Sequence, residues 1–238
     1  PTALLGVALG TILLPSLSKA NSDGDTAEYS ALLDWGLRLT FLLALPCAIA
    51  LATLSLPLTT TLFHYGKFDE QAVTMTGNAL IAYGVGLIGL IVVKILAPGF
   101  YAKQNIKTPV KIAVGVLIAS QFMNMIFVPW IAHAGLALSV GLGACLNALF
   151  LYSGLKRRGI YVAQSGWMFF FIRLVGALFL MAGIGLWISG YVDWIGLQTQ
   201  PLKRIMLLAT VMMACVLTYF GALFAMGFRV TDFKRITS

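Results

Sequence analysis

Hydrophobic residues fill most of the chain in long blocks that short polar stretches separate. A block of about 20 apolar residues can cross the ~30 Å hydrocarbon core of a bilayer. Blocks long enough for a full crossing lie at 35–62, 74–101, 109–131, 134–155, 167–190 and 204–228, and a shorter one lies at 3–15. The pattern predicts an all-α polytopic membrane protein with one partial span and six full spans.

Composition agrees with this class. The chain is 60% hydrophobic and 10% charged, whereas soluble domains are about 45–50% apolar and about 25% charged. It begins PTALLGVALGTILLP, without a basic leader or a cleavage site, as though inside a helix. We therefore expect the chain to be the C-terminal portion of a longer protein.

The net charge of +8 does not indicate nucleic-acid binding, because the basic residues fall in short loops between apolar blocks. If the loop around 103–111 and the C-terminal tail share one side, that side holds twelve of the 16 Lys and Arg residues. The other side holds Lys67, Lys203 and Arg204, and Lys94 lies within a span. The positive-inside rule then predicts a cytoplasmic C-terminus.

Lys94 is a candidate for a functional charge inside the membrane. On a helical wheel it shares a stripe with Tyr83 and Tyr101, as the wall of a hydrated cavity would require. Intramembrane charges are costly and usually functional. The alternative is that the lysine side chain extends to the cytoplasmic headgroups.

Prolines predict irregular points in two spans. Pro98 removes a helical hydrogen bond and Gly99 permits a bend, so we expect a hinge where this span ends. Pro46 predicts a second hinge in the block at 35–62.

Four further polar residues are candidates for the substrate path, each with a structural alternative. Arg38 is spaced to form an ion pair with Asp34 at i,i+4. Arg173 can extend to the interface instead. Gln121 and Asn124 share a face and form either interhelical hydrogen bonds or a cavity lining.

The remaining polar residues narrow the classes of function that the chain could have. A single histidine without partners, His64, is weak evidence for a proton relay. The face Gly135, Ser139, Gly143 and Asn147 predicts close helix packing. All eight acidic residues fall in loops, tails or helix mouths, which favours an anionic substrate over a cationic one. No catalytic, cofactor or metal-binding motif is present, so we do not expect an enzyme.

Three stretches carry a resemblance: ALGTILLPSLSK at 8–19, LFHYGKFD at 62–69 and ILAPGFYAKQNIKTPVKI at 95–112. In this order and spacing the chain is similar to the MurJ (MviN) family of lipid II flippases, in the multidrug/oligosaccharidyl-lipid/polysaccharide exporter superfamily. GWMFFFIRL at 166–174 extends the similarity.

The resemblance implies fourteen helices, arranged as two lobes and two further helices. This chain would supply a partial MATE-like second lobe at 1–158 and the two additional C-terminal helices at 159–238. The implied activity is transfer of undecaprenyl-pyrophosphate-linked disaccharide pentapeptide, lipid II, across the bacterial inner membrane by alternating access. Implied partners are membrane lipids and the missing N-terminal lobe, whose cationic residues precede Pro1. The alternative is a flippase for another such lipid-linked oligosaccharide, for example an O-antigen unit.

Overall fold

The computed structural model describes residues 2–228, and every regular element in that range is a helix. In chain order these are the π-helix η1 (Thr2–Gly6), α1 (Val7–Ser22), α2 (Thr26–Thr53), α3 (Ser55–Phe63), α4 (Glu70–Leu96), α5 (Pro98–Tyr101), α6 (Lys107–Arg157), α7 (Trp167–Gly190), the 3₁₀ helix η2 (Gly196–Thr199) and α8 (Pro201–Ala225). The basic tail residues Arg229, Lys234 and Arg235, predicted to be cytoplasmic, lie outside the described residues.

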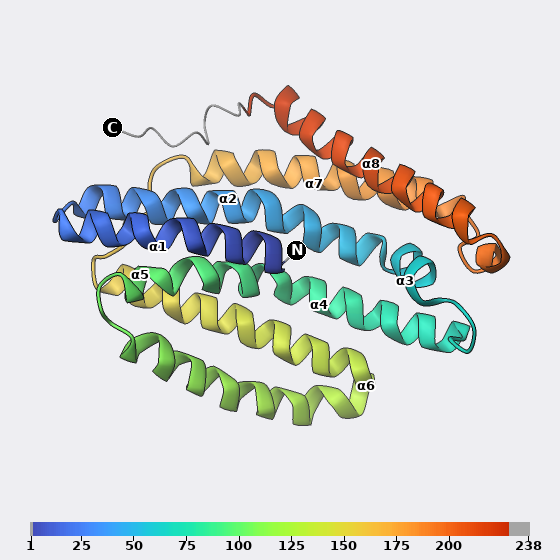
Figure 1. The fold of residues 1–238 in the computed structure, drawn as a ribbon, viewed down its shortest axis with the longest axis horizontal. Coiled ribbons are helices and arrows are strands. Elements are labelled where there is room, and N and C mark those ends of the chain that lie inside the picture. The colour runs from blue at the N-terminus through green and yellow to red at the C-terminus, as the bar shows by residue number, and fades with distance from the viewer. Residues whose placement is uncertain (1, 229–238) are drawn as a thin grey trace. The chain divides into compact units, whose positions relative to one another are not determined.

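Five helices are long and apolar enough to cross a membrane: α2, α4 with α5, α6, α7 and α8. Of these, α6 is two helices, because Ile131 and Ala132 have non-helical backbone angles. Ala132 has a φ of 46°, and Figure 1 shows α6 doubling back as a hairpin. The all-α polytopic class is confirmed, and α6 accounts for two of the six predicted spans.

Several predicted boundaries were wrong. α2 begins at Thr26, earlier than the predicted 35, because Asp25 caps it: its Oδ1 accepts the Glu28 N–H at 2.8 Å. Pro46 lies inside α2 without ending the helix, and the break comes at Leu54, with φ −106° and ψ 20°. α4 does end at Leu96, just before Pro98. The role of either proline as a moving hinge stays a prediction.

The chain divides into two compact units. Unit 1 comprises Pro1–Leu45 with Val85–Ser165, and unit 2 comprises Pro46–Gly84 with Gly166–Ser238, so that α2 and α4 each contribute to both. The predicted division at 158 and 159 rests on the family resemblance and stays a prediction.

Unit 1 is built on a close contact between α4 and the second half of α6. A Cβ on Gly86 would collide with the backbone of Gly141, and one on Gly89 would lie 2.5 Å from the Cys145 N atom. Glycine at both positions lets the two backbones approach, as is common between membrane helices.

The two halves of the α6 hairpin also pack through small residues. A Cβ on Gly143 would collide with the Ser120 side chain, and Ser139 is fully buried. The predicted close packing of the small-residue face is therefore confirmed for Gly143. Its neighbour is the preceding half of the same hairpin.

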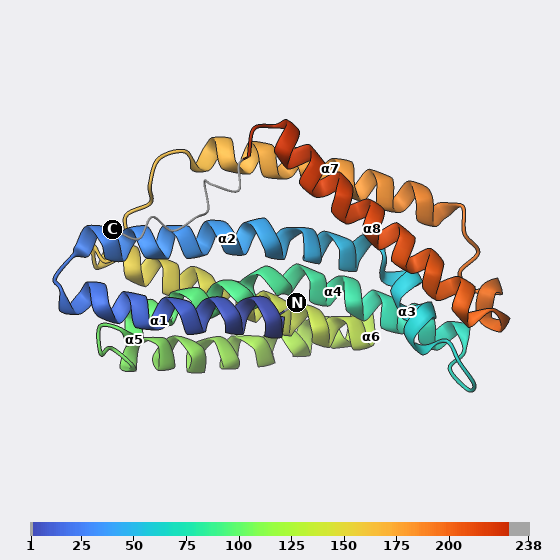
Figure 2. The ribbon, with the colours of Figure 1, turned by 45° about the horizontal axis from the view of Figure 1, so that its top comes forward.

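Unit 2 is built around the crossing of α7 and α8, which lie against each other in Figures 1 and 2. The buried face of α8 repeats every three or four residues: Arg204, Leu208, Val211, Cys215, Tyr219 and Leu223. Gly185 of α7 faces Cys215, with a Cβ position 3.0 Å from its Sγ. α3 packs against α8 in the same unit.

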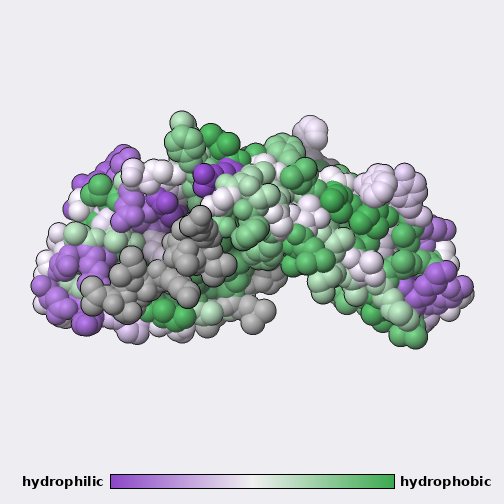
Figure 3. Space-filling model, turned by 90° about the horizontal axis from the view of Figure 1, so that it is seen from above, coloured by the Kyte–Doolittle hydropathy of each residue, from purple (hydrophilic) through white to green (hydrophobic). Residues whose placement is uncertain are grey.

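Much of the visible surface is hydrophobic (Figure 3). Trp130 is 86% exposed and Phe224 is 78% exposed. Large exposed apolar side chains in this number are typical of helices that face lipid.

Gly89→Ala should destabilise the protein by about 1–3 kcal/mol, because the added methyl group meets helix backbone that cannot yield cheaply. Thermal unfolding in detergent measures the effect. Gly115→Ala on α6 is the matched control, because nothing lies within 4 Å of its Cβ position. Equal melting temperatures for the two variants would contradict the α4–α6 contact.

Candidate substrate-path site

Lys94 lies near the end of α4 and is half-buried. Its side chain packs against the first residues of the chain. A Cβ on Gly6 would be 2.5 Å from the Lys94 Cδ atom and 3.4 Å from Cε. Gly6 itself is buried. Because glycine has no side chain, Gly6 leaves the space that the aliphatic part of the Lys94 side chain occupies.

The backbone at Lys94 is equally close to α1. Pro98 has no N–H, so it cannot donate the usual helical hydrogen bond to the Lys94 carbonyl. A Cβ on Gly10 would lie 3.2 Å from that oxygen. Gly6 and Gly10, one turn apart, thus bring the first helical turns of the chain against Lys94.

Lys94 has no carboxylate within ion-pair distance among the residues that the structure describes. A cation of this kind, partly removed from water, attracts an anionic group. The site can therefore bind an anion electrostatically. Within residues 2–228 no group of three or more His, Cys, Asp or Glu side chains could hold a metal ion.

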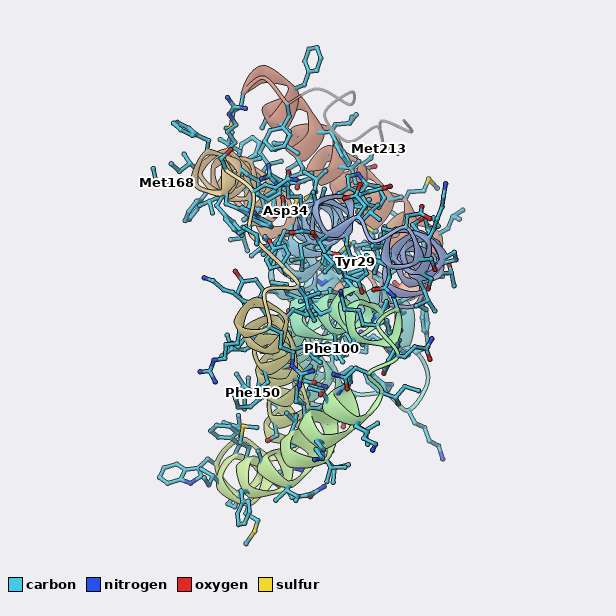
Figure 4. The ribbon with its side chains drawn as sticks, turned by 90° about the vertical axis from the view of Figure 1, so that its left-hand side faces the viewer. Tyr29, Asp34, Phe100, Phe150, Met168 and Met213 are labelled. Atoms are coloured by element: carbon cyan, nitrogen blue, oxygen red, sulfur yellow. The ribbon has the colours of Figure 1, made fainter. Side chains whose placement is uncertain are left out.

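The helix end after Lys94 is held in place. The Tyr29 hydroxyl donates to the Gly99 carbonyl at 2.7 Å, and Gly99 is buried against Leu33 and Leu155. Figure 4 shows Tyr29 on α2 and Phe100 on α5. Tyr101 is 39% exposed. The backbone at Pro98 and Gly99 is thus buried and hydrogen-bonded, and its role as a hinge stays a prediction.

Arg38 belongs to a polar cluster around Asp34, which we call the Asp34 cluster. Asp34 is 1% exposed; it accepts hydrogen bonds from Arg38 Nε at 2.8 Å, the Tyr161 hydroxyl at 2.7 Å and the Gln164 N–H at 3.2 Å. Arg38 Nη2 also donates to the Ser165 carbonyl at 2.8 Å. The i,i+4 ion pair considered for Arg38 is present, and it fastens the loop after α6 to α2.

Tyr161 is the neutral donor of the cluster. Burial, and secondly its hydrogen bond to Asp34, raise the pKa of the Tyr161 hydroxyl above its ordinary value. The hydroxyl therefore stays protonated, and remains a donor, throughout the physiological pH range.

The remaining candidates have contacts of their own. Asn124 Nδ2 donates to Gln121 Oε1 at 3.5 Å, a bond within one helix of α6 and not between helices. The Asn124 Oδ1 is buried and has no partner in the described part of the chain. Tyr83 and Arg173 belong to unit 2. Arg173 is exposed, with its guanidinium carbon 5.8 Å from the centre of the Phe228 ring.

Sequence reasoning missed the glycines opposite Lys94 and the distant members of the Asp34 cluster. The spacing Gly6-x-x-x-Gly10 is the signal that could have found the former. Tyr161 and Gln164 are more than a hundred residues from Asp34, and no local pattern points to them.

The long apolar helices define a polytopic helical membrane protein. A family model described as "Lipid II flippase MurJ" matches residues 1–206. The chain therefore belongs to the MurJ family.

Relatives agree with this assignment. The chain is 61% identical over 235 residues to the lipid II flippase MurJ of Burkholderia cenocepacia, covering 99% of this chain and 46% of the relative. It is 31% identical over 238 residues to the probable lipid II flippase MurJ of Vibrio cholerae, covering 100% of this chain and 45% of the relative. The chain thus spans about half the length of these relatives. Their names do not favour the O-antigen alternative.

A solved structure confirms the fold. "Lipid II flippase MurJ, inward closed conformation" matches with a TM-score of 0.72 and 20% identity, over 94% of this chain and 45% of that one.

Tyr161→Phe should destabilise the protein by about 1–3 kcal/mol, because it leaves an oxygen of buried Asp34 short of a donor. Thermal unfolding in detergent measures the loss. Because the folded-state pKa is raised, the contribution is fully present below pH ~10, the unfolded value, and declines as pH rises through the folded value.

Tyr152→Phe is the matched control for this cluster. Its ring packs edge-on to Tyr161 at 5.5 Å, and its hydroxyl has no hydrogen bond in the described residues. A Tyr161→Phe protein as stable as this control would show that the hydroxyl contributes nothing.

Proposed function

We propose that this chain forms the C-terminal part of a lipid II flippase. The complete transporter, with an N-terminal lobe, moves the undecaprenyl-pyrophosphate-linked disaccharide pentapeptide from the cytoplasmic to the periplasmic leaflet of the bacterial inner membrane. It acts by alternating access and catalyses no covalent step. Family membership and the names of the relatives support this activity.

The observation that carries the proposal is the placement of Lys94. A pyrophosphate crossing a membrane needs cationic partners along its path. Lys94 lies in a predicted span, is only half-buried, and lacks a carboxylate partner among the described residues. Its stem is held over Gly6, so its charge is positioned before substrate arrives.

Arg38 is a weaker candidate for the same role. Its Nε and Nη2 atoms already bond Asp34 and the Ser165 carbonyl. Binding substrate through these atoms would disrupt the Asp34 cluster. Lys94 can bind an anion without that loss.

The orientation proposed from the charge distribution places the C-terminus in the cytoplasm. Lys103, Lys107 and Lys111 then lie at the cytoplasmic face, where they interact with anionic lipid headgroups. Lys94 lies on α4 shortly before these residues, so a substrate entering from the cytoplasm meets its charge early.

In a full-length protein containing this chain, Lys94→Ala should lower lipid II translocation at least about tenfold, and Lys94→Arg should retain most of it, because the charge is what is required. Lipid II on the outer leaflet, probed by a periplasmic reagent, is the readout. Lys111→Ala, which removes an exposed cation near the start of α6, is the control. Normal transport by Lys94→Ala at normal abundance would mean that the lysine only extends to the headgroups.

Gly6→Ala tests the same site without altering charge. Its methyl group would force the flexible Lys94 stem to a new path, so we expect a folded protein with reduced translocation. Unchanged translocation would show that the position of the lysine stem over Gly6 does not matter for transport.

A further inference from the structure

Arg204, in the first turn of α8, is a fully buried cation in unit 2, 0% exposed. It contacts the connection between α3 and α4. Its Nη2 donates to the His64 carbonyl at 3.3 Å, and its guanidinium carbon lies 4.9 Å from the centre of the Tyr65 ring. These contacts place Arg204 beside the stretch LFHYGKFD.

The other donors of this guanidinium are unpaired. Nε and Nη1 are buried and find no acceptor in the described chain, and the nearby residue His64 has a buried Nδ1 without a partner. No carboxylate of residues 2–228 lies within 4.0 Å of Arg204. A buried charge left without a counter-charge is strongly unfavourable, so this position favours the binding of an anion.

The backbone at this point also favours an anion. Pro201 opens α8, and the N-cap residue Gln200 makes no side-chain capping bond. The N–H groups of Leu202 and Lys203 therefore have no helical partner, and the helix dipole places partial positive charge there. α8 is 25 residues long, so this end carries its full effect.

The acidic residues near these connections are occupied elsewhere. Asp193 Oδ1 accepts the Gly196 N–H at 2.9 Å, and Asp69 Oδ1 accepts the Ala72 N–H at 2.8 Å to cap α4. The side chains of Lys67 and Lys203 are exposed, so water and salt screen their charges. Arg204 is therefore left without a carboxylate partner among the described residues.

We propose that Arg204 and His64 form a binding site for a phosphate group, supplied either by a phospholipid headgroup or by free phosphate. The planar guanidinium presents two N–H groups to phosphate oxygens, and the His64 Nδ1 can donate a third bond. Tyr65 is 40% exposed and covers the guanidinium from a turn in which Gly66 has a φ of 58°. The site is separate from Lys94 and does not depend on the flippase function.

The charge distribution places this end of α8 opposite the basic loops, on the periplasmic side. A phosphate there meets the outer-leaflet headgroups. The LFHYGKFD stretch then has a physical role, because its turn supplies the carbonyl that accepts from Arg204 and the aromatic ring that lies against the guanidinium.

The test is lipid binding by the full-length protein, delipidated in neutral detergent and followed by native mass spectrometry. Phosphatidylglycerol should bind the wild type at least about tenfold more tightly than Arg204→Gln, since charge-assisted bonds are lost. Lys203→Gln, the exposed neighbouring cation, should bind like the wild type. Arg204→Lys keeps the charge and should have intermediate affinity. If Arg204→Gln does not fold, the affinity of Arg204→Lys is compared with that of the wild type instead.

Two further arms identify the source of the phosphate. Displacement of phosphatidylglycerol by millimolar inorganic phosphate identifies a site for free phosphate, whereas retention identifies one that requires the headgroup on its lipid. Diacylglycerol has no phosphate, so Arg204→Gln and the wild type should bind it with equal affinity. Equal phosphatidylglycerol affinity for wild type, Arg204→Lys and Arg204→Gln would overturn the proposal. So would a loss of affinity in Arg204→Gln that is the same for diacylglycerol as for phosphatidylglycerol.

Discussion

The contact of α4 with the second half of α6 is the constraint on which unit 1 depends. Between membrane helices there is little hydrophobic driving force, so stability comes from dispersion contacts at short range. Gly86, Gly89 and Gly141 allow backbone to touch backbone. That contact fixes the rotation of α4 about its axis. At about 100° per residue, Lys94 is then directed roughly 140° away from Gly89, toward α1.

The same physical solution recurs where Lys94 meets α1. Gly6 and Gly10 remove the side chains that would otherwise occupy the path of the lysine stem and the space beside its carbonyl. Close packing and a partly buried charge are therefore compatible, because the aliphatic stem is packed and the charged end is not forced into the apolar interior. The Asp34 cluster and the Tyr29 bond to Gly99 then hold the adjoining helix ends.

The sequence predicted the number and class of the spans because about 20 apolar residues in a row have few other uses. It also predicted the ion pair of Arg38, whose partner is one turn away. It failed where partners are remote, as with Tyr161, and where a helix begins with polar residues, as at Thr26. Pro46 does not end α2, because a membrane helix can tolerate a proline when its neighbours satisfy the backbone. Hydropathy alone does not show which groups lie beside the proline.

Three cations in this chain show how burial separates structural charges from binding charges. Arg38 is partly exposed and bonded to a carboxylate, so its position is explained within the protein. Lys94 is half-buried, so its charge is solvated only in part, as its proposed role in binding an anionic substrate requires. Arg204 is fully buried with two unpartnered nitrogens. Because the free energy of an uncompensated charge rises steeply with burial, Arg204 requires a counter-ion most strongly, although its sequence position suggested only a loop-proximal basic residue.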